Sequence, residues 1–145
     1  DRWNDVVIDT PPSVGALTQA GLAAADVIIA PVVPSVEAYD QLRRLTAVLN
    51  ARIAKRVNRG ASISWVVPVA FDSRAAQGRG RLLDREILAQ LRDTYHERVT
   101  PPVRDSVTAR DAYLESLPVG AYAPDTPVAT DYAEAVRVII EGVAS

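Results

Sequence analysis

Apolar residues along this chain follow two different spacings, which divide it into strands and helices. Three largely apolar runs are rich in β-branched residues, the pattern of strands buried on both faces of a parallel sheet. These runs cover residues 6–8, 27–33 and 62–71. Elsewhere small or periodically spaced apolar residues predict helices. The predicted helices cover residues 15–25, 36–58, 81–97, 105–117 and a last segment that begins at Pro127.

Strands that alternate with helices predict an α/β fold. We expect a three-layer, mostly parallel sheet flanked by helices, with a right-handed crossover between the first two strands. The chain contains no internal repeat and no long linker, so its 145 residues are expected to form one domain.

Several residues define the ends of these elements. Ser13 is placed to cap the first helix, and Thr126 followed by Pro127 is placed to begin the last. The turn-rich segment before Thr126 predicts a short edge strand at residues 119–122. The last helix carries an apolar stripe that is expected to face the core; its members are Val128, Tyr132, Val136, Ile139, Ile140 and Val143.

Composition excludes several classes of protein. The chain is 48% apolar and 23% charged, as soluble globular proteins are. It has no cysteine and one histidine, His96, which excludes disulfides and zinc sites built from thiolates or several histidines. No apolar run approaches a membrane span and no signal-peptide pattern opens the chain, so a cytoplasmic location without membrane contact is expected. Methionine is absent. Proteolytic processing or a designed start could explain this, but a fragment or a truncated reading frame is the simpler expectation.

The net charge of −2 hides an uneven distribution. No acidic residue lies between Asp40 and Asp72, although six cations do: Arg43, Arg44, Arg52, Lys55, Arg56 and Arg59. Cations near the end of a helix are favoured by its dipole, which is one explanation. The other is a surface that binds an anionic partner, and the pattern alone leaves both open.

The opening segment carries the main candidate for chemistry. Its apolar run ends at Asp9, and Pro11 and Pro12 then prevent the strand from continuing. In open α/β sheets ligands bind beyond the carboxyl ends of the strands, where a carboxylate can hold the water shell of a nucleotide-bound Mg²⁺. An aspartate that accepts hydrogen bonds within a turn is the alternative.

Val-Val-Ile-Asp-Thr-Pro-Pro-Ser, residues 6–13, resembles the Walker B and switch segment of the ParA/MinD family of ATPases, and the plasmid-partition ParA branch most closely. The resemblance extends over essentially the whole chain. A G-x-x-x-x-G-K-[ST] phosphate-binding loop is missing from the sequence, and residues 78–81 have neither its spacing nor its lysine. The resemblance therefore implies that residues 1–145 are an incomplete α/β domain, the carboxyl-terminal portion of a P-loop NTPase fold.

The resemblance also implies roles for particular residues at the nucleotide. Asp9 would approach Mg²⁺ mainly through water, and Thr10 and Pro11 would lie in a loop that responds to the nucleotide. Asp72 would accept a hydrogen bond from the adenine amino group, with a helix cap or turn residue as the alternative. A loop would border the base; its residues are Pro101, Pro102, Val103 and Arg104. This loop departs from the Pro-Arg-Asn of the chromosomal branch, so its contacts with the base stay open.

For DNA, the resemblance implies that Arg74 makes sequence-independent contacts, with a solvated loop cation as the alternative. Charge asymmetry alone adds weaker candidates: Arg52, Lys55, Arg56, Arg79 and Arg81. His96 is given no catalytic role, and no catalytic side chain is assigned.

The implied function is a partition ATPase in plasmid or chromosome segregation. ATP with Mg²⁺ would drive formation of a homodimer and its non-specific binding to DNA at the nucleoid, and a ParB-like centromere-binding partner would stimulate hydrolysis. Without the phosphate-binding loop, the chain by itself is expected to be inactive. The alternative is a non-enzymatic remnant or interaction module with the same fold. A MinD-like membrane cycle is disfavoured because the last helix lacks a strongly basic amphipathic face, and a biosynthetic ligase because no substrate motif is visible.

Overall fold

The computed structural model describes residues 3, 5–11, 15–55 and 57–144. Two strands and six α-helices follow one another in this part of the chain, joined by short π and 3-10 turns. In order they are α1 (Ala16–Ala24), β1 (Ile29–Val32), α2 (Val36–Val48), η1 (Leu49–Ile53), β2 (Trp65–Pro68), η2 (Ala75–Gln77), α3 (Leu82–Tyr95), η3 (His96–Arg98), α4 (Val107–Leu114), α5 (Val119–Tyr122) and α6 (Pro127–Val143).

A small parallel sheet forms the middle of the molecule. β1 and β2 pair in parallel, with Ile29 opposite Trp65 and Val32 opposite Pro68. Residues 99–104 run parallel to β2 along its other edge, through isolated bridges at Val66–Val99 and Phe71–Arg104. The α/β class is therefore confirmed, but the sheet in the described residues has two full strands and is narrower than the extended sheet expected from the sequence.

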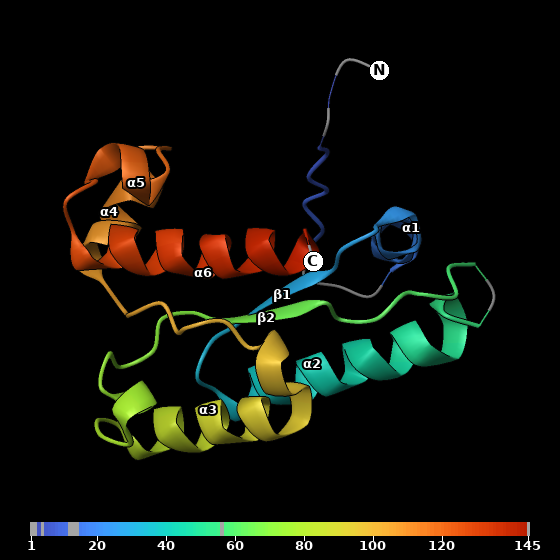
Figure 1. Ribbon diagram of the computed structural model, residues 1–145, viewed down its shortest axis with the longest axis horizontal. Helices are drawn as coiled ribbons and strands as arrows, with labels where there is room; N and C mark the ends of the chain where they lie inside the picture. Colours follow the sequence, from blue (N-terminus) through green and yellow to red (C-terminus); the bar gives the residue numbers. More distant parts are fainter. Residues whose placement is uncertain (1–2, 4, 12–14, 56, 145) are drawn as a thin grey trace.

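Helices cover both faces of this sheet (Figure 1). Successive side chains of a strand point to opposite faces, and β2 shows this directly. Val66 belongs to the larger apolar cluster, which includes Leu42 and Leu49 of the α2–η1 region and Leu88 of α3. Val67 belongs to a second, smaller cluster with Val103, Val128 and Ala135, the last two from α6.

The opening segment does not form the buried strand that its apolar run predicts. Residues 5–11 have no regular structure and all are exposed, with Val7 94% exposed. Figure 1 shows this segment extending away from the sheet. A strand is held by hydrogen bonds to a neighbouring strand, and β1 and β2 pair with each other rather than with this segment. The predicted helix cap at Ser13 lies outside the described residues.

Two expectations for the carboxyl-terminal region are also wrong. Residues 119–122 form a helical turn, because Pro118 accepts the backbone N–H of Tyr122 and Val119 accepts that of Ala123. The apolar stripe of α6 is only partly buried: Val128 lies in the core, whereas Val136, Ile140 and Val143 are exposed. A helix with its side chains is about 10 Å across, and neighbouring strands lie about 4.8 Å apart. The two-stranded sheet therefore covers one side of α6 and leaves the side that carries Val136, Ile140 and Val143 exposed.

Candidate functional site

A pocket of about 500 Å³ lies at the carboxyl end of the sheet. Val69 and Ala70, which follow β2 directly, form one wall. Arg104 and its two successors form a second wall, at the end of the segment that runs beside β2. Parallel strands end at the same edge of a sheet, and this edge is where ligands bind in open α/β folds. The pocket is therefore the main candidate site.

Arg104 is fixed in the wall of this pocket by α6. Its Nη2 donates to Asp131 Oδ1 over 2.9 Å, its Nε donates to Asp131 Oδ2, and its backbone N–H donates to the same Oδ2 over 3.0 Å. Partial burial alone would raise the pKa of Asp131, but these hydrogen bonds outweigh it and hold that pKa below its ordinary value. Asp131 in turn raises the pKa of Arg104. The pair joins the 101–104 loop to α6 and sets the shape of the pocket.

The rest of the lining combines cations with apolar surface. Arg110 of α4 donates to Asp105 over 2.9 Å and lines the pocket beside it. Tyr113 and Leu114 of α4 and Tyr132 of α6 supply aromatic and aliphatic walls. Flat apolar surface next to guanidinium groups suits a planar ring that carries an anionic group. Sequence analysis missed these three residues; Tyr132 was assigned to the core because its spacing matches that of Val128.

A second polar cluster lies in the loop between β2 and α3. Asp72 accepts hydrogen bonds from Arg74 Nε at 3.0 Å and Nη2 at 2.9 Å, and from two backbone N–H groups. These bonds hold the pKa of Asp72 well below its ordinary value. Asp84, only 2% exposed, accepts from the backbone of Asp72 and from the Arg81 guanidinium. Arg81 also donates to the Ala70 carbonyl, so the cluster adjoins the pocket wall.

The predicted nucleotide-binding residues are brought together only in part. Arg104 lines the pocket, and Val103, its neighbour in the chain, is buried in the smaller apolar cluster. Pro101 and Pro102 precede them in the same loop. Asp72 is a neighbour of the pocket through Arg81 and does not line it.

Asp9, Thr10 and Pro11 do not reach this site. They are exposed and do not line the pocket, and the Thr10 side chain lies close to Gly21 of α1. Asp9 supplies a single carboxylate, and the described residues contain no group of three potential ligands that could hold a metal ion. Because Mg²⁺ needs an octahedral set of oxygens, the described residues do not by themselves make the expected metal site.

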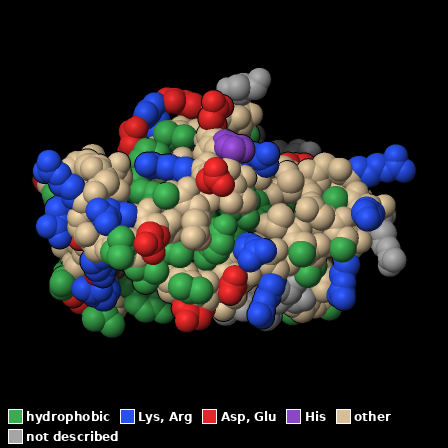
Figure 2. Space-filling model, turned by 90° about the horizontal axis from the view of Figure 1, so that it is seen from below, with side chains coloured by type: hydrophobic (Ala, Val, Ile, Leu, Met, Phe, Trp, Pro, Cys, Tyr) green, Lys and Arg blue, Asp and Glu red, His purple; other side chains and the backbone are tan. Residues whose placement is uncertain are grey.

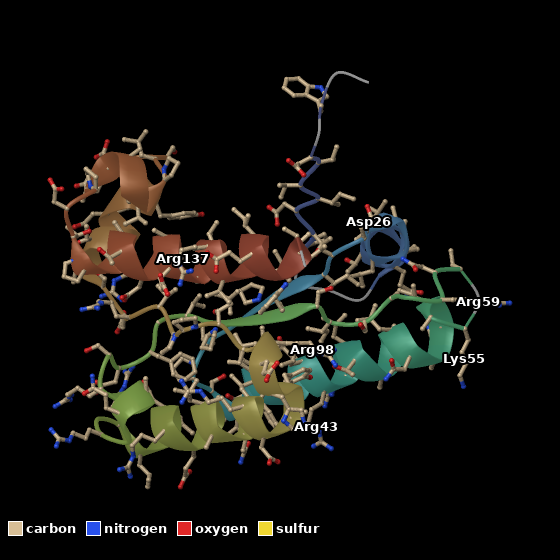
Figure 3. The ribbon with its side chains drawn as sticks, viewed as in Figure 1. Asp26, Arg43, Lys55, Arg59, Arg98 and Arg137 are labelled. Atoms are coloured by element: carbon tan, nitrogen blue, oxygen red, sulfur yellow. The ribbon has the colours of Figure 1, made fainter. Side chains whose placement is uncertain are left out.

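The cations proposed for DNA form two groups. Figure 3 places Lys55, with Arg59, at the end of the α2 region, and Figure 1 places the loop of residues 72–81 at the opposite end of the α2–α3 layer. Arg52 lies in η1, near Lys55. Figure 2 shows basic side chains interspersed with acidic and apolar ones over that layer. The candidates therefore do not form one uniform basic face, and Arg56 lies outside the described residues.

Two of the three arginines proposed for DNA in the loop at 72–81 are already held by carboxylates. Arg74 is bound to Asp72 and Arg81 to Asp84, whereas Arg79 is exposed.

No helix in the described part of the chain is long and apolar enough to cross a membrane.

Comparison with known proteins gives consistent similarities. A family profile described as "AAA domain" matches residues 1–63. The chromosome-partitioning ATPase Soj of Treponema pallidum is 27% identical over 143 residues, which are 97% of this chain and 53% of that protein. An uncharacterised protein of Mycobacterium tuberculosis is 27% identical over 142 residues, 97% of this chain and 42% of that protein.

An uncharacterised protein of Pseudomonas putida is 30% identical over 118 residues, 81% of this chain and 41% of that protein. This chain thus spans about half the length of these relatives, or less. No solved structure matches it at a significant level.

Proposed function

Because this chain is related to the ParA/MinD-like P-loop ATPases, we propose that it is the carboxyl-terminal part of a partition ATPase. The observation that carries the proposal is the alignment of 97% of the chain with a chromosome-partitioning ATPase. The pocket at the carboxyl end of the sheet supports it, because nucleotides bind at that edge in α/β folds.

In the proposed ATPase the pocket receives the adenine end of ATP. The loop of Pro101, Pro102, Val103 and Arg104 borders the base, and the Arg104–Asp131 pair keeps that loop in place. Asp72 adjoins this pocket through Arg81 without lining it, so the loop of residues 72–81 shifts toward the base when Asp72 accepts a hydrogen bond from the adenine amino group. A phosphate-binding loop, which this sequence does not contain, supplies the backbone N–H groups and the lysine that hold the phosphates.

Asp9, Thr10 and Pro11 take their nucleotide-responsive role only when residues 6–8 pair as a strand. A neighbouring strand from another part of the ATPase would provide that pairing. The single carboxylate of Asp9 would then stand near Mg²⁺ together with phosphate oxygens, which a metal site of this type requires.

At the level of the whole ATPase, ATP binding drives formation of a homodimer that binds DNA without sequence preference at the cytoplasmic nucleoid. Arg74 is the principal contact, with Arg52, Lys55, Arg56, Arg79 and Arg81 as additional cations. A ParB-like centromere-binding protein stimulates hydrolysis. A non-enzymatic remnant is the less favoured alternative, because the similarity covers nearly the whole chain rather than a short motif.

The experiment measures binding of a fluorescent ATP analogue to the full-length protein. Arg110→Ala removes a pocket cation that is more than half exposed and bonded only to Asp105 among the described contacts. We expect it to weaken nucleotide binding about tenfold, which corresponds to about 1.4 kcal/mol. Arg137→Ala is the matched control, because Arg137 is similarly exposed and pairs with Glu134 and Glu141 away from the pocket.

If Arg110→Ala and Arg137→Ala bind the ATP analogue equally well, the proposal that the pocket holds the nucleotide is wrong. Absence of nucleotide binding by the unmodified full-length protein would reject the ATPase itself.

A further inference from the structure

The loop between β2 and α3 is organised around two carboxylates that point inward. Asp84 is 2% exposed and holds the backbone of Asp72 and the guanidinium of Arg81. The Asp72 side chain is 12% exposed and holds Arg74. Each carboxylate is therefore more buried than the arginine it binds, and the outward-facing charges of Arg74 and Arg81 are already paired.

Arg74 illustrates why exposure does not make an arginine available. Its side chain is 66% exposed, yet Nε and Nη2 both donate to the carboxylate oxygens of Asp72. That edge is one of the two edges of a guanidinium that can bind a phosphate group through two parallel hydrogen bonds. A phosphate that approaches Arg74 therefore meets a charge-neutralised pair in which one of these edges is occupied.

Asp72 can lose Arg74 and remain hydrogen-bonded. Its Oδ1 also accepts the backbone N–H of Arg74 at 3.0 Å, and its Oδ2 accepts that of Arg81 at 3.3 Å. The loop itself keeps the carboxylate in position: a Cβ on Gly80 would lie 2.5 Å from the Asp72 carboxyl carbon. Separation of the pair therefore breaks one solvent-exposed ion pair, which is weak in water, and leaves the carboxylate bound.

We propose that Asp72 masks Arg74, so that the guanidinium contacts DNA phosphates only after it leaves this carboxylate. The inference rests on the proposed DNA binding and describes how the Asp72–Arg74 pair would regulate that binding. In the proposed function Asp72 also accepts the adenine amino group. Adenine and Arg74 then compete for one carboxylate, and nucleotide binding releases the arginine toward DNA.

The test is a salt titration of the nucleotide-free full-length protein on a random-sequence duplex. Asp72→Asn keeps one oxygen, which can accept one of the two backbone N–H groups, and removes the negative charge that pairs with Arg74. We expect this variant to bind several-fold more tightly than the unmodified protein, with a salt slope that is steeper by about one because one more phosphate is contacted.

Asp40→Asn is the matched control. It changes the net charge by the same amount, and the Asp40–Arg43 pair that it removes is loose, at 3.8 Å, and exposed. We expect Asp40→Asn to increase DNA affinity less than Asp72→Asn does, and to leave the slope of affinity against salt concentration unchanged. The double variant Asp72→Asn, Arg74→Ala should bind no better than Arg74→Ala alone, which shows that the gain passes through Arg74.

Arg74→Lys tests the same ion pair without changing Asp72, so it gives a result even if Asp72→Asn disturbs the loop. Lysine keeps the charge but cannot occupy both carboxylate oxygens as a planar fork, so nucleotide-free binding should again rise. If neither Asp72→Asn nor Arg74→Lys exceeds the Asp40→Asn control while the ATP-bound protein binds DNA, masking is wrong and the proposed function stands. If no variant binds DNA with or without ATP, both fail.

Discussion

At the residue scale, the structure shows that arginines chosen by sequence as free contacts are held by aspartates. Arg104, in a loop, is bound by Asp131 of α6, 27 positions away in the chain, and Arg74 is bound by Asp72, two positions before it. The first pair joins two elements and the second shapes one loop. Each ion pair is therefore expected to contribute to the stability of the fold, and this contribution can be measured by unfolding the protein without a ligand.

Asp131→Asn should destabilise the fold by about 1–2 kcal/mol, the usual loss when a charged group leaves a hydrogen-bonded network. Because the folded-state pKa of Asp131 is lowered from 3.8, its contribution is fully present above that value. It is lost as pH falls through the lower folded-state pKa. Urea unfolding should show that the variant has a lower free energy of unfolding than the unmodified protein at neutral pH, and that this difference becomes smaller below about pH 3.8. A difference in unfolding free energy that does not change with pH would contradict the account.

Gly80→Ala should destabilise the protein by about 2 kcal/mol, since Gly80 has φ of +80° and an added Cβ would clash with the Asp72 carboxylate. Gly120→Ala is the control, because nothing lies within 4 Å of its added Cβ and alanine favours the helix. Thermal unfolding of both variants measures the difference. Similar midpoints for the two would show that the loop relaxes around the new methyl group.

At the scale of elements, the structure leaves apolar surface on segments that sequence analysis assigned to the interior. Residues 6–8 are exposed, and so are Val136, Ile140 and Val143 of α6. In the described residues β1 pairs with β2 alone, so its other edge has no partner strand. Exposed strand edges and apolar patches favour association.

The 145-residue chain should therefore self-associate, and Ile140→Lys should reduce that association. Ile140 is 63% exposed, so the substitution should change the free energy of unfolding by less than about 0.5 kcal/mol. Val128→Ala, at a buried position of the same helix, should cost about 2 kcal/mol. Sedimentation velocity measures the self-association, and urea unfolding measures the two changes in stability. A monodisperse monomer with a sharp thermal transition would contradict the predicted self-association.

At the scale of the molecule, the pocket and the Asp9 segment are separate. The pocket is lined by residues from 69 onward, and residues 5–11 do not contribute to it. A nucleotide in this pocket would meet cations from the 104–110 region but no glycine-rich loop, which the sequence does not contain.

The chain as given should consequently show no Mg²⁺-dependent ATP hydrolysis. Phosphoryl transfer needs backbone N–H groups and a lysine around the phosphates, and the sequence supplies neither in the required motif. A phosphate-release assay with and without Mg²⁺ measures this. Turnover above the protein-free rate would contradict it.

The sequence by itself determined the helices and the α/β class, because a helix satisfies its backbone hydrogen bonds within one segment. Ser35 caps α2 by accepting the Ala38 backbone N–H, and Pro127 begins α6 as predicted. Only the tertiary structure decided what depends on distant partners. Residues 6–8 lack a strand to pair with, and the Arg104 side chain is directed by Asp131. A strand, a buried stripe and an ion pair each need a neighbour that local spacing does not specify, which is why the pattern located the loop of Arg104 but not the walls of its pocket.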